Sequence, residues 1–115
     1  MITIKRIYEP RESSDGTRVL VDRLWPRGLK KETAGIDLWA KAIAPSTELR
    51  QWYDHRSERW QEFQLRYKSE LTNANANEEL ARLRMAGRSG NVTLLTATSN
   101  EKQSHAVVLQ QLLGA

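Results

Sequence analysis

The sequence predicts a small α/β fold, with a mostly parallel sheet and helices packed around it. Strand-like segments alternate with helical ones along the chain. Residues 19–21 are continuously apolar, as expected for a strand buried on both faces of a parallel sheet. The chain has 115 residues and no internal repeat. We therefore expect a single domain over residues 1–115 with Rossmann-like layering.

The N-terminal part predicts two strands joined by a loop. Residues 2–8 are rich in β-branched side chains and predict the first strand. Residues 9–18 are rich in turn residues and predict a loop. Residues 19–22 predict a second, short strand. Pro26 and Gly28 then prevent that strand from continuing.

The middle of the chain predicts helices. Residues 32–43 predict a helix or a half-ordered turn, because their apolar residues recur on one side, although Gly35 weakens a helix. Ser46 or Thr47 can cap the helix that follows. Residues 57–73 predict a longer helix with one apolar stripe. We expect that stripe in the core; its members are Trp60, Phe63, Tyr67 and Leu71.

The C-terminal part predicts helix, strand and helix. Residues 72–77 form a polar break, and residues 78–87 predict a short helix capped by its final glycine. Residues 92–96 predict a third strand. Residues 98–101 have the form of a capping box at the start of a last helix, whose apolar residues lie in 108–113.

Composition excludes several classes of function. The chain has no cysteine, which excludes disulfides, thiolate catalysis and cysteine-based metal sites. No apolar run approaches the roughly 20 residues of a membrane helix, and the segment MITIKRIYEP is too charged for a signal peptide. We therefore expect a cytoplasmic protein with no membrane partner. The net charge of +4 comes from bases mixed with acids, so we do not expect a nucleic-acid partner.

Motifs for common cofactors are absent. The sequence contains no GxGxxG, no GxxxxGK[ST] and no GxSxG. Its two histidines, His55 and His105, lie far apart in the sequence and do not predict a metal site. We therefore expect no cofactor and no metal. The sequence does not predict an oligomeric state.

Charged residues gather where the strand at 19–22 ends. Asp22 lies at the carboxyl end of the strand, where it could act as a base, accept a hydrogen bond from a hydroxyl or hold an arginine in place. Arg23 adds a base, and Arg27 follows a proline on a stiffened turn suited to capturing an anion. Gly28 allows close backbone approach. The alternative is a salt bridge between Asp22 and Arg27 that only fastens the loop.

Two ring-bearing residues also have two interpretations each. Trp25 could stack on a planar ligand or pack in the core. His105 lies near the start of the last helix, where it could be an acid or base, or a hydrogen-bonded core histidine. Ligands of parallel sheets bind at the carboxyl ends of the strands. We therefore expect Asp22, Arg27 and His105 in one cleft, and we assign His55 a structural or capping role.

Four stretches match a known family: VLVDRLWPRGLKKE, APSTELRQWYDHRSERWQEFQLRY, VTLLTATS and SHAVVL. In these, the sequence resembles the DUF488 family in its short YeaO-like branch, over nearly the whole chain. The resemblance implies an α/β fold of Rossmann-like layering in a bacterial cytoplasmic protein, and no known reaction. The residues that fit the branch are Asp22, Arg23, Trp25, Pro26, Arg27, Gly28, Ser46 and His105.

The sequence departs from the family at two motifs. Longer relatives have a strand ending in Cys-Ala-Glu and then Cys-His-Arg; the YeaO-like branch more often has Tyr-Ala followed by Lys or Arg, and then Asn-His. Here residues 96–98 are Thr-Ala-Thr and residues 104–106 are Ser-His-Ala. Of the polar residues in the longer relatives' two motifs, only the histidine, here His105, is retained. The site is therefore expected to be weakened or altered.

Two hypotheses follow. The first is an enzyme, former enzyme or binding protein for a small anionic ligand, such as a nucleotide or phosphorylated metabolite. The alternative is a non-catalytic module that binds a protein or nucleic acid through its basic loop. In the first hypothesis Asp22 and His105 are the catalytic candidates, and the ligand-binding candidates are Arg23, Trp25, Arg27, Gly28 and Ser46.

Overall fold

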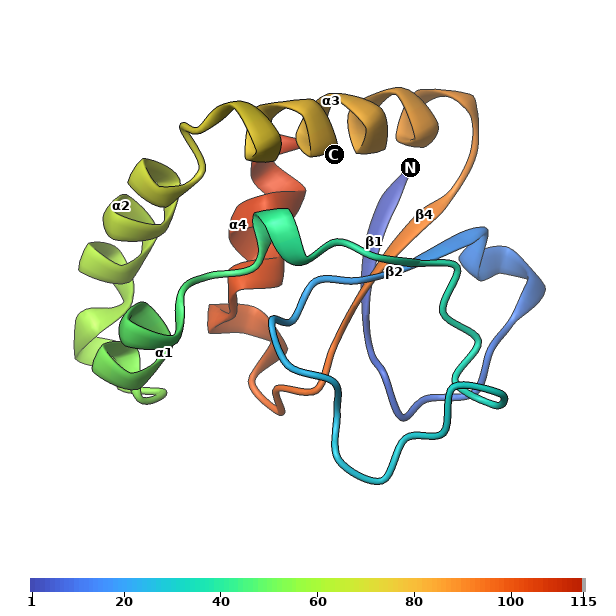
Figure 1. Cartoon of the computed structure of the whole chain (residues 1–115), viewed down its shortest axis with the longest axis horizontal. Coiled ribbons are helices and arrows are strands. Elements are labelled where there is room, and N and C mark those ends of the chain that lie inside the picture. Colours follow the sequence, from blue (N-terminus) through green and yellow to red (C-terminus); the bar gives the residue numbers. More distant parts are fainter. Residues whose placement is uncertain (115) are drawn as a thin grey trace.

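The computed structural model describes residues 1–114 and confirms the α/β class (Figure 1). Its sheet has four strands in the order β1-β4-β2-β3, and every neighbouring pair is parallel. In the register, Leu94 of β4 lies between Ile4 of β1 and Val19 of β2. The strands are β1 (Ile2–Arg6), β2 (Thr17–Leu20), β3 (Leu38–Trp39) and β4 (Val92–Thr96).

The helices of the described chain gather on one side of the sheet. In Figure 1, α4 lies beside β1 and β4, α3 crosses one end of the sheet, and α1 and α2 lie together farther out. Helix α4 contacts β1, β4 and α2, so it joins the sheet to the outer helices. The helices are α1 (Thr47–Tyr53), α2 (Trp60–Glu70), α3 (Ala74–Ser89) and α4 (His105–Leu112).

The two faces of the sheet are covered differently. Because successive residues of a strand point to opposite faces, Val19 and Val21 enter the main core beneath the helices while Leu20 enters a second cluster. That second cluster is covered by loop residues, including Trp25 and Ile36. Loops cover this face because residues 22–37 contain the proline and glycines that stop helix formation.

A buried ion pair lies on the loop-covered face. Arg18 of β2 is 1% exposed, and its Nη1 lies 2.5 Å from a carboxylate oxygen of Asp15. The Arg18 Nε donates to the carbonyl of Gly35 at 2.7 Å, and Lys5 Nζ lies 3.0 Å from Asp15. Burial alone raises the pKa of Asp15, but hydrogen bonds from Glu12, Lys5 and Arg18 outweigh it and lower that pKa to about 2.

The apolar stripe of α2 packs in the main core as predicted. Phe63 and Tyr67 are buried, and Leu71 joins them just beyond the helix. Trp60 is half-buried at the edge of the same core. Phe63 also stacks on Tyr53 of α1, with ring centroids 4.4 Å apart, which fixes α1 against α2.

The helix or turn predicted over residues 32–43 is instead a short strand and a 3-10 turn. Backbone amides of Asp37 and Ala40 donate to the carbonyls of Arg18 and Leu20, both at 2.8 Å, so this segment pairs with the free edge of β2. Gly35 has a left-handed φ of +65°, which prevents a helix from continuing up to the strand. The 3-10 turn is Lys41–Ile43.

Helix α3 is longer at both ends than predicted. It begins inside the expected polar break because the side chain of Asn73 accepts the backbone N–H of Ala76 at 2.8 Å. Gly87, predicted as its cap, lies inside the helix. A Cβ on Gly87 would lie 2.4 Å from Cδ1 of Ile2, so the glycine lets β1 approach α3 closely.

The last helix also starts differently. Instead of a capping box at residues 98–101, Asn100 accepts the backbone N–H of Gln103 at 3.3 Å and starts the 3-10 turn Glu101–Gln103. Helix α4 then begins at His105. Within residues 1–114, no helix has both the length and the apolar character that crossing a bilayer requires.

Candidate functional site

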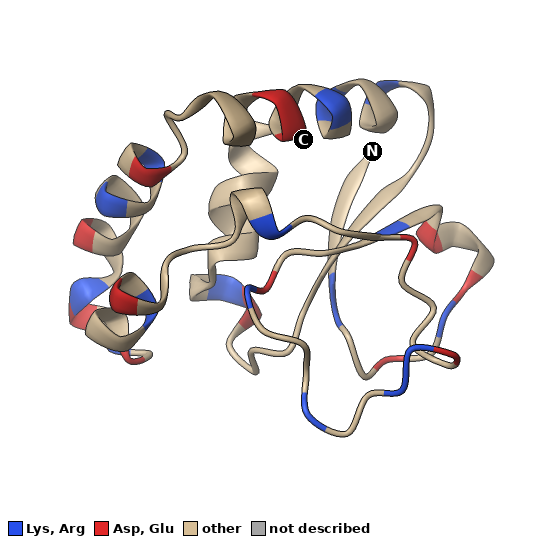
Figure 2. Ribbon diagram, in the orientation of Figure 1, with Lys and Arg blue, Asp and Glu red and all other residues tan. Residues whose placement is uncertain are grey.

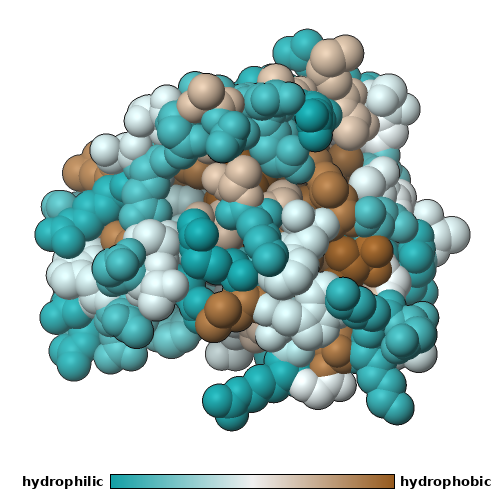
Figure 3. Space-filling view, viewed as in Figure 1, coloured by the Kyte–Doolittle hydropathy of each residue, from teal (hydrophilic) through white to brown (hydrophobic). Residues whose placement is uncertain are grey.

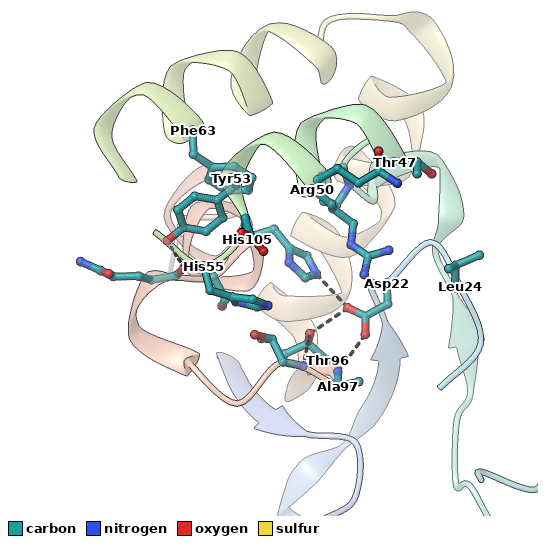
Figure 4. Close-up of a pocket in the computed structure, with 16 residues that line it drawn as sticks. Asp22, Leu24, Thr47, Arg50, Tyr53, His55, Phe63, Thr96, Ala97 and His105 are labelled. Atoms are coloured by element: carbon teal, nitrogen blue, oxygen red, sulfur yellow. Dashed lines mark hydrogen bonds and ion pairs between the residues drawn. The ribbon is translucent and has the colours of Figure 1, made fainter. Parts of the chain in front are cut away.

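A cavity of about 510 Å³ opens at the carboxyl ends of β2 and β4 (Figure 4). Its walls come from the ends of those two strands, from α1 with the turn after it, and from the start of α4. The chain leaves β4 toward α4 on the helical side, whereas it leaves β2 toward the neighbouring β3. Such diverging connections leave the crevice in which ligands of parallel α/β sheets bind.

Asp22 and His105 meet at the floor of this cavity. Asp22 follows β2, and its carboxylate accepts hydrogen bonds from the Thr96 hydroxyl and from the Ala97 backbone N–H, both at 2.8 Å. His105 Nε2 lies 2.9 Å from Oδ1 of Asp22. This confirms that the two residues share one cleft. Their contact joins the end of β2 to the start of α4.

The ionised Asp22 carboxylate makes Nε2 of His105 the donor of their hydrogen bond. Burial raises the pKa of Asp22, but the hydrogen bond and charge of His105, with those of Ala97 and Thr96, outweigh it and lower that pKa. An ionised carboxylate only accepts, so Nε2 of His105 carries the proton. Nδ1 of His105 makes no hydrogen bond to a residue of the described chain.

Arg23 and Ser46 hold the frame of the cavity rather than lining it. Arg23 donates to the carbonyls of Pro45 and Ala44, both at 3.0 Å. The Ser46 hydroxyl caps α1 by accepting the N–H of Leu49 at 3.1 Å, and it donates to Glu70 at 2.5 Å. Nε and Nη2 of Arg23 and the hydroxyl of Ser46 therefore donate within the fold.

Trp25, Arg27 and Gly28 lie on the loop that covers the other face of the sheet. Trp25 packs edge-on against Trp39, 5.2 Å between centroids, and donates to the carbonyl of Leu29 at 2.7 Å. Gly28 has a φ of +74°, with open space where a Cβ would lie, so it serves the turn rather than a close approach.

Arg27 is exposed on that turn and does not line the cavity. Arg27 therefore does not share the expected cleft with Asp22 and His105, because the turn directs the chain away from the end of β2. The alternative salt bridge is not formed either. The hydrogen-bond partners of the Asp22 carboxylate in the described chain are Thr96, Ala97 and His105.

Two basic residues of the cavity were not predicted as ligand residues. Figure 4 shows the guanidinium of Arg50 extending from α1 toward Asp22, and the imidazole of His55 extending into the same space. His55 and the preceding Asp54 both have a left-handed φ, 53° and 46°. This turn after α1 brings His55 back over the cavity, a conformation that no local sequence signal indicates.

Apolar side chains complete the walls. Tyr53 and Phe63 line one part, and the Tyr53 hydroxyl donates to the carbonyl of Gln103 at 2.8 Å, joining α1 to the segment before α4. Leu24, 63% exposed, lines another part. In the described part of the chain, no group of three or more His, Cys, Asp or Glu side chains is placed to hold a metal ion.

A second cavity, of about 750 Å³, opens near the start of β1. Arg84 and Arg88 of α3 contribute to its walls, but Arg84 donates to the carbonyl of Leu112 at 3.0 Å. This cavity lies at the amino end of its strand, opposite the edge where parallel sheets bind ligands.

Fold and cavity define a small parallel α/β protein with its candidate site at the strands' carboxyl ends. A family model described as "Inactive DUF488-N3 subclade" matches residues 1–115, so the chain belongs to the DUF488 family, as predicted. An uncharacterized protein of Mycobacterium tuberculosis is 48% identical over 112 residues, 97% of this chain and 92% of that protein. The uncharacterized protein YeaO of Escherichia coli is 44% identical over 112 residues, 97% and 96% of the two chains. No solved structure gives a significant match.

Proposed function

We propose that this protein binds a small anionic ligand, such as a nucleotide or phosphorylated metabolite, without transforming it. The observation that carries the proposal is the cavity at the ends of β2 and β4, into which Arg50 and His55 extend. Arg50 forms no ion pair with a residue of the described chain, so its guanidinium can bind an anion without breaking an existing contact.

The hydrogen bonds around His105 support binding rather than catalysis. A histidine that activates a hydroxyl must accept its proton. Nε2 of His105 donates to Asp22, so only Nδ1 could accept a proton, and no hydroxyl of the described residues donates to it. The neighbouring hydroxyls are also engaged: Thr96 Oγ1 donates to Asp22, and Ser104 Oγ to the carbonyl of Glu101. The description of the matching family model as inactive agrees with this reading.

The surface gives less support to a docking module. Figure 2 shows acids and bases alternating on α1 and α2, with no face of a single sign there that would favour nucleic acid. Hydrophobic residues on the face in Figure 3 lie in separate small areas among hydrophilic ones. Docking surfaces usually need a larger continuous apolar patch.

The proposal is tested with inorganic phosphate as the probe. Calorimetry should show saturable binding of phosphate to the wild-type protein. The affinity should be about ten- to a hundredfold lower in Arg50→Ala, because the loss of one charge-assisted hydrogen bond usually has an effect of this size. Arg82→Ala removes an equal charge from the exposed surface of α3 and should leave binding unchanged.

Arg27→Ala separates the two possible anion sites. If the cavity holds the anion, this variant binds phosphate as the wild type does. A loss in Arg27→Ala with none in Arg50→Ala would instead place the anion on the exposed turn. Equal affinities in all variants, or no binding by the wild type, would overturn the proposal.

A further inference from the structure

The Asp22 carboxylate has one acceptor position to spare. A carboxylate offers about four lone-pair positions. Oδ1 of Asp22 takes the bonds from Thr96 and His105, whereas Oδ2 takes only the Ala97 N–H, at 2.8 Å. The side chain is 15% exposed and lines the cavity. Oδ2 can therefore accept one more hydrogen bond from within the cavity.

The charge of Asp22 restricts what can bind beside it. Arg50 extends toward Asp22 but forms no ion pair with it, so the cavity presents a cation and an anion side by side. A ligand that is anionic over its whole length would be repelled by Asp22. A ligand with an anionic group for Arg50 and a neutral donor for Asp22 satisfies both groups at once.

We infer that the ligand carries a hydroxyl group close to its anionic group, and that Asp22 selects for that hydroxyl. This inference rests on the proposed function, since it requires the anion to lie on Arg50. The hydroxyl donates to Oδ2, while the three protein donors keep the carboxylate fixed in place. Sugar phosphates and other hydroxylated phosphate esters are the chemical class that fits.

Three probes test the inference: inorganic phosphate, propyl phosphate and glycerol 3-phosphate. The last two have similar length and charge but differ in their hydroxyls. The wild-type protein should bind glycerol 3-phosphate about ten- to a hundredfold more tightly than propyl phosphate. In amide NMR spectra, glycerol 3-phosphate should shift the Ala97 signal, whose N–H shares Oδ2, more than propyl phosphate does.

Asp22→Asn adds a second measurement. It should abolish the preference for glycerol 3-phosphate while keeping or improving phosphate binding, because a negative charge is removed beside Arg50. If that variant does not fold, the comparison of probes on the wild type decides alone. Equal affinities for the two esters would overturn the inference and leave the proposed function standing. Failure of all three probes to bind would instead overturn the proposed function.

Discussion

The buried Asp15 and the half-buried Asp22 show how placement gives one residue type different roles. Both have a lowered pKa, because hydrogen bonds from neighbouring donors outweigh the effect of burial. Asp15 is 5% exposed, is held by Lys5, Arg18 and the backbone of Glu12, and lines neither of the two cavities described above. Asp22 lines the cavity and keeps a position for a further donor. Asp15 is therefore a structural residue, and Asp22 a candidate ligand residue.

The structural role of Asp15 predicts a pH dependence of folding. Its pKa in the folded protein, about 2, lies below the ordinary value of 3.8. Its contribution is therefore complete above about pH 4 and is lost as the pH falls toward 2. Asp15→Asn should lower the free energy of unfolding by about 3–5 kcal/mol at neutral pH, since it leaves Arg18 buried without its partner. The stability of this variant should also depend less on pH between 4 and 2 than that of the wild type.

Urea unfolding at several pH values measures both effects. Glu12→Gln is the matched control, because Glu12 also pairs with Lys5 but its side chain is 67% exposed. It should change the free energy of unfolding by less than about 1 kcal/mol. An Asp15→Asn variant as stable as this control would show that the buried pair does not stabilise the fold.

At the scale of elements, α2 offers a comparison of its buried and outer faces. Phe63 is 2% exposed in the main core, whereas Leu65 on the same helix is 65% exposed. Phe63→Ala should lower the free energy of unfolding by about 3–5 kcal/mol, and Leu65→Ala by less than about 0.5 kcal/mol. Similar losses in the two variants, measured by denaturant unfolding, would contradict this placement of the helix.

Apolar patterns, a continuous run in the strand at 19–22 and a spacing of three to four residues in the helix at 57–73, predicted elements that pack in the main core. The strands around Val19 and Leu94 and the stripe of Phe63 and Tyr67 lie where the sequence indicated. Residues 32–43 were misread because their structure depends on pairing with β2, a contact distant in sequence. The start of α3 was missed because Asn73, inside an apparent break, is its cap.

The candidate site was predicted in part. Asp22 and His105 follow from the rule that strand ends carry ligands, since each lies just after a strand or at the start of the next helix. Arg27 was expected beside them because it follows the same strand as Asp22. The turn after Pro26 carries it away from the cavity, and residue types alone do not encode the direction of that turn. Arg50 was missed because its place over the cavity depends on how α1 packs against α2.

For the whole molecule, the difference between the two faces of the sheet explains where a ligand can bind. Helices enclose one face, and a loop fastened by Trp25 and Arg18 encloses the other. The open space lies where β2 and β4 end and their connections part. Our central claim is that a small anion binds in that space.

An amide NMR titration of the labelled protein with inorganic phosphate tests this claim most directly. We predict saturable shifts that cluster in residues 50–55, 96–98 and 103–105, the segments that line the cavity. Shifts confined to residues 26–31, or to Arg84 and Arg88 at the second cavity, would contradict the claim. So would the absence of any saturable shift.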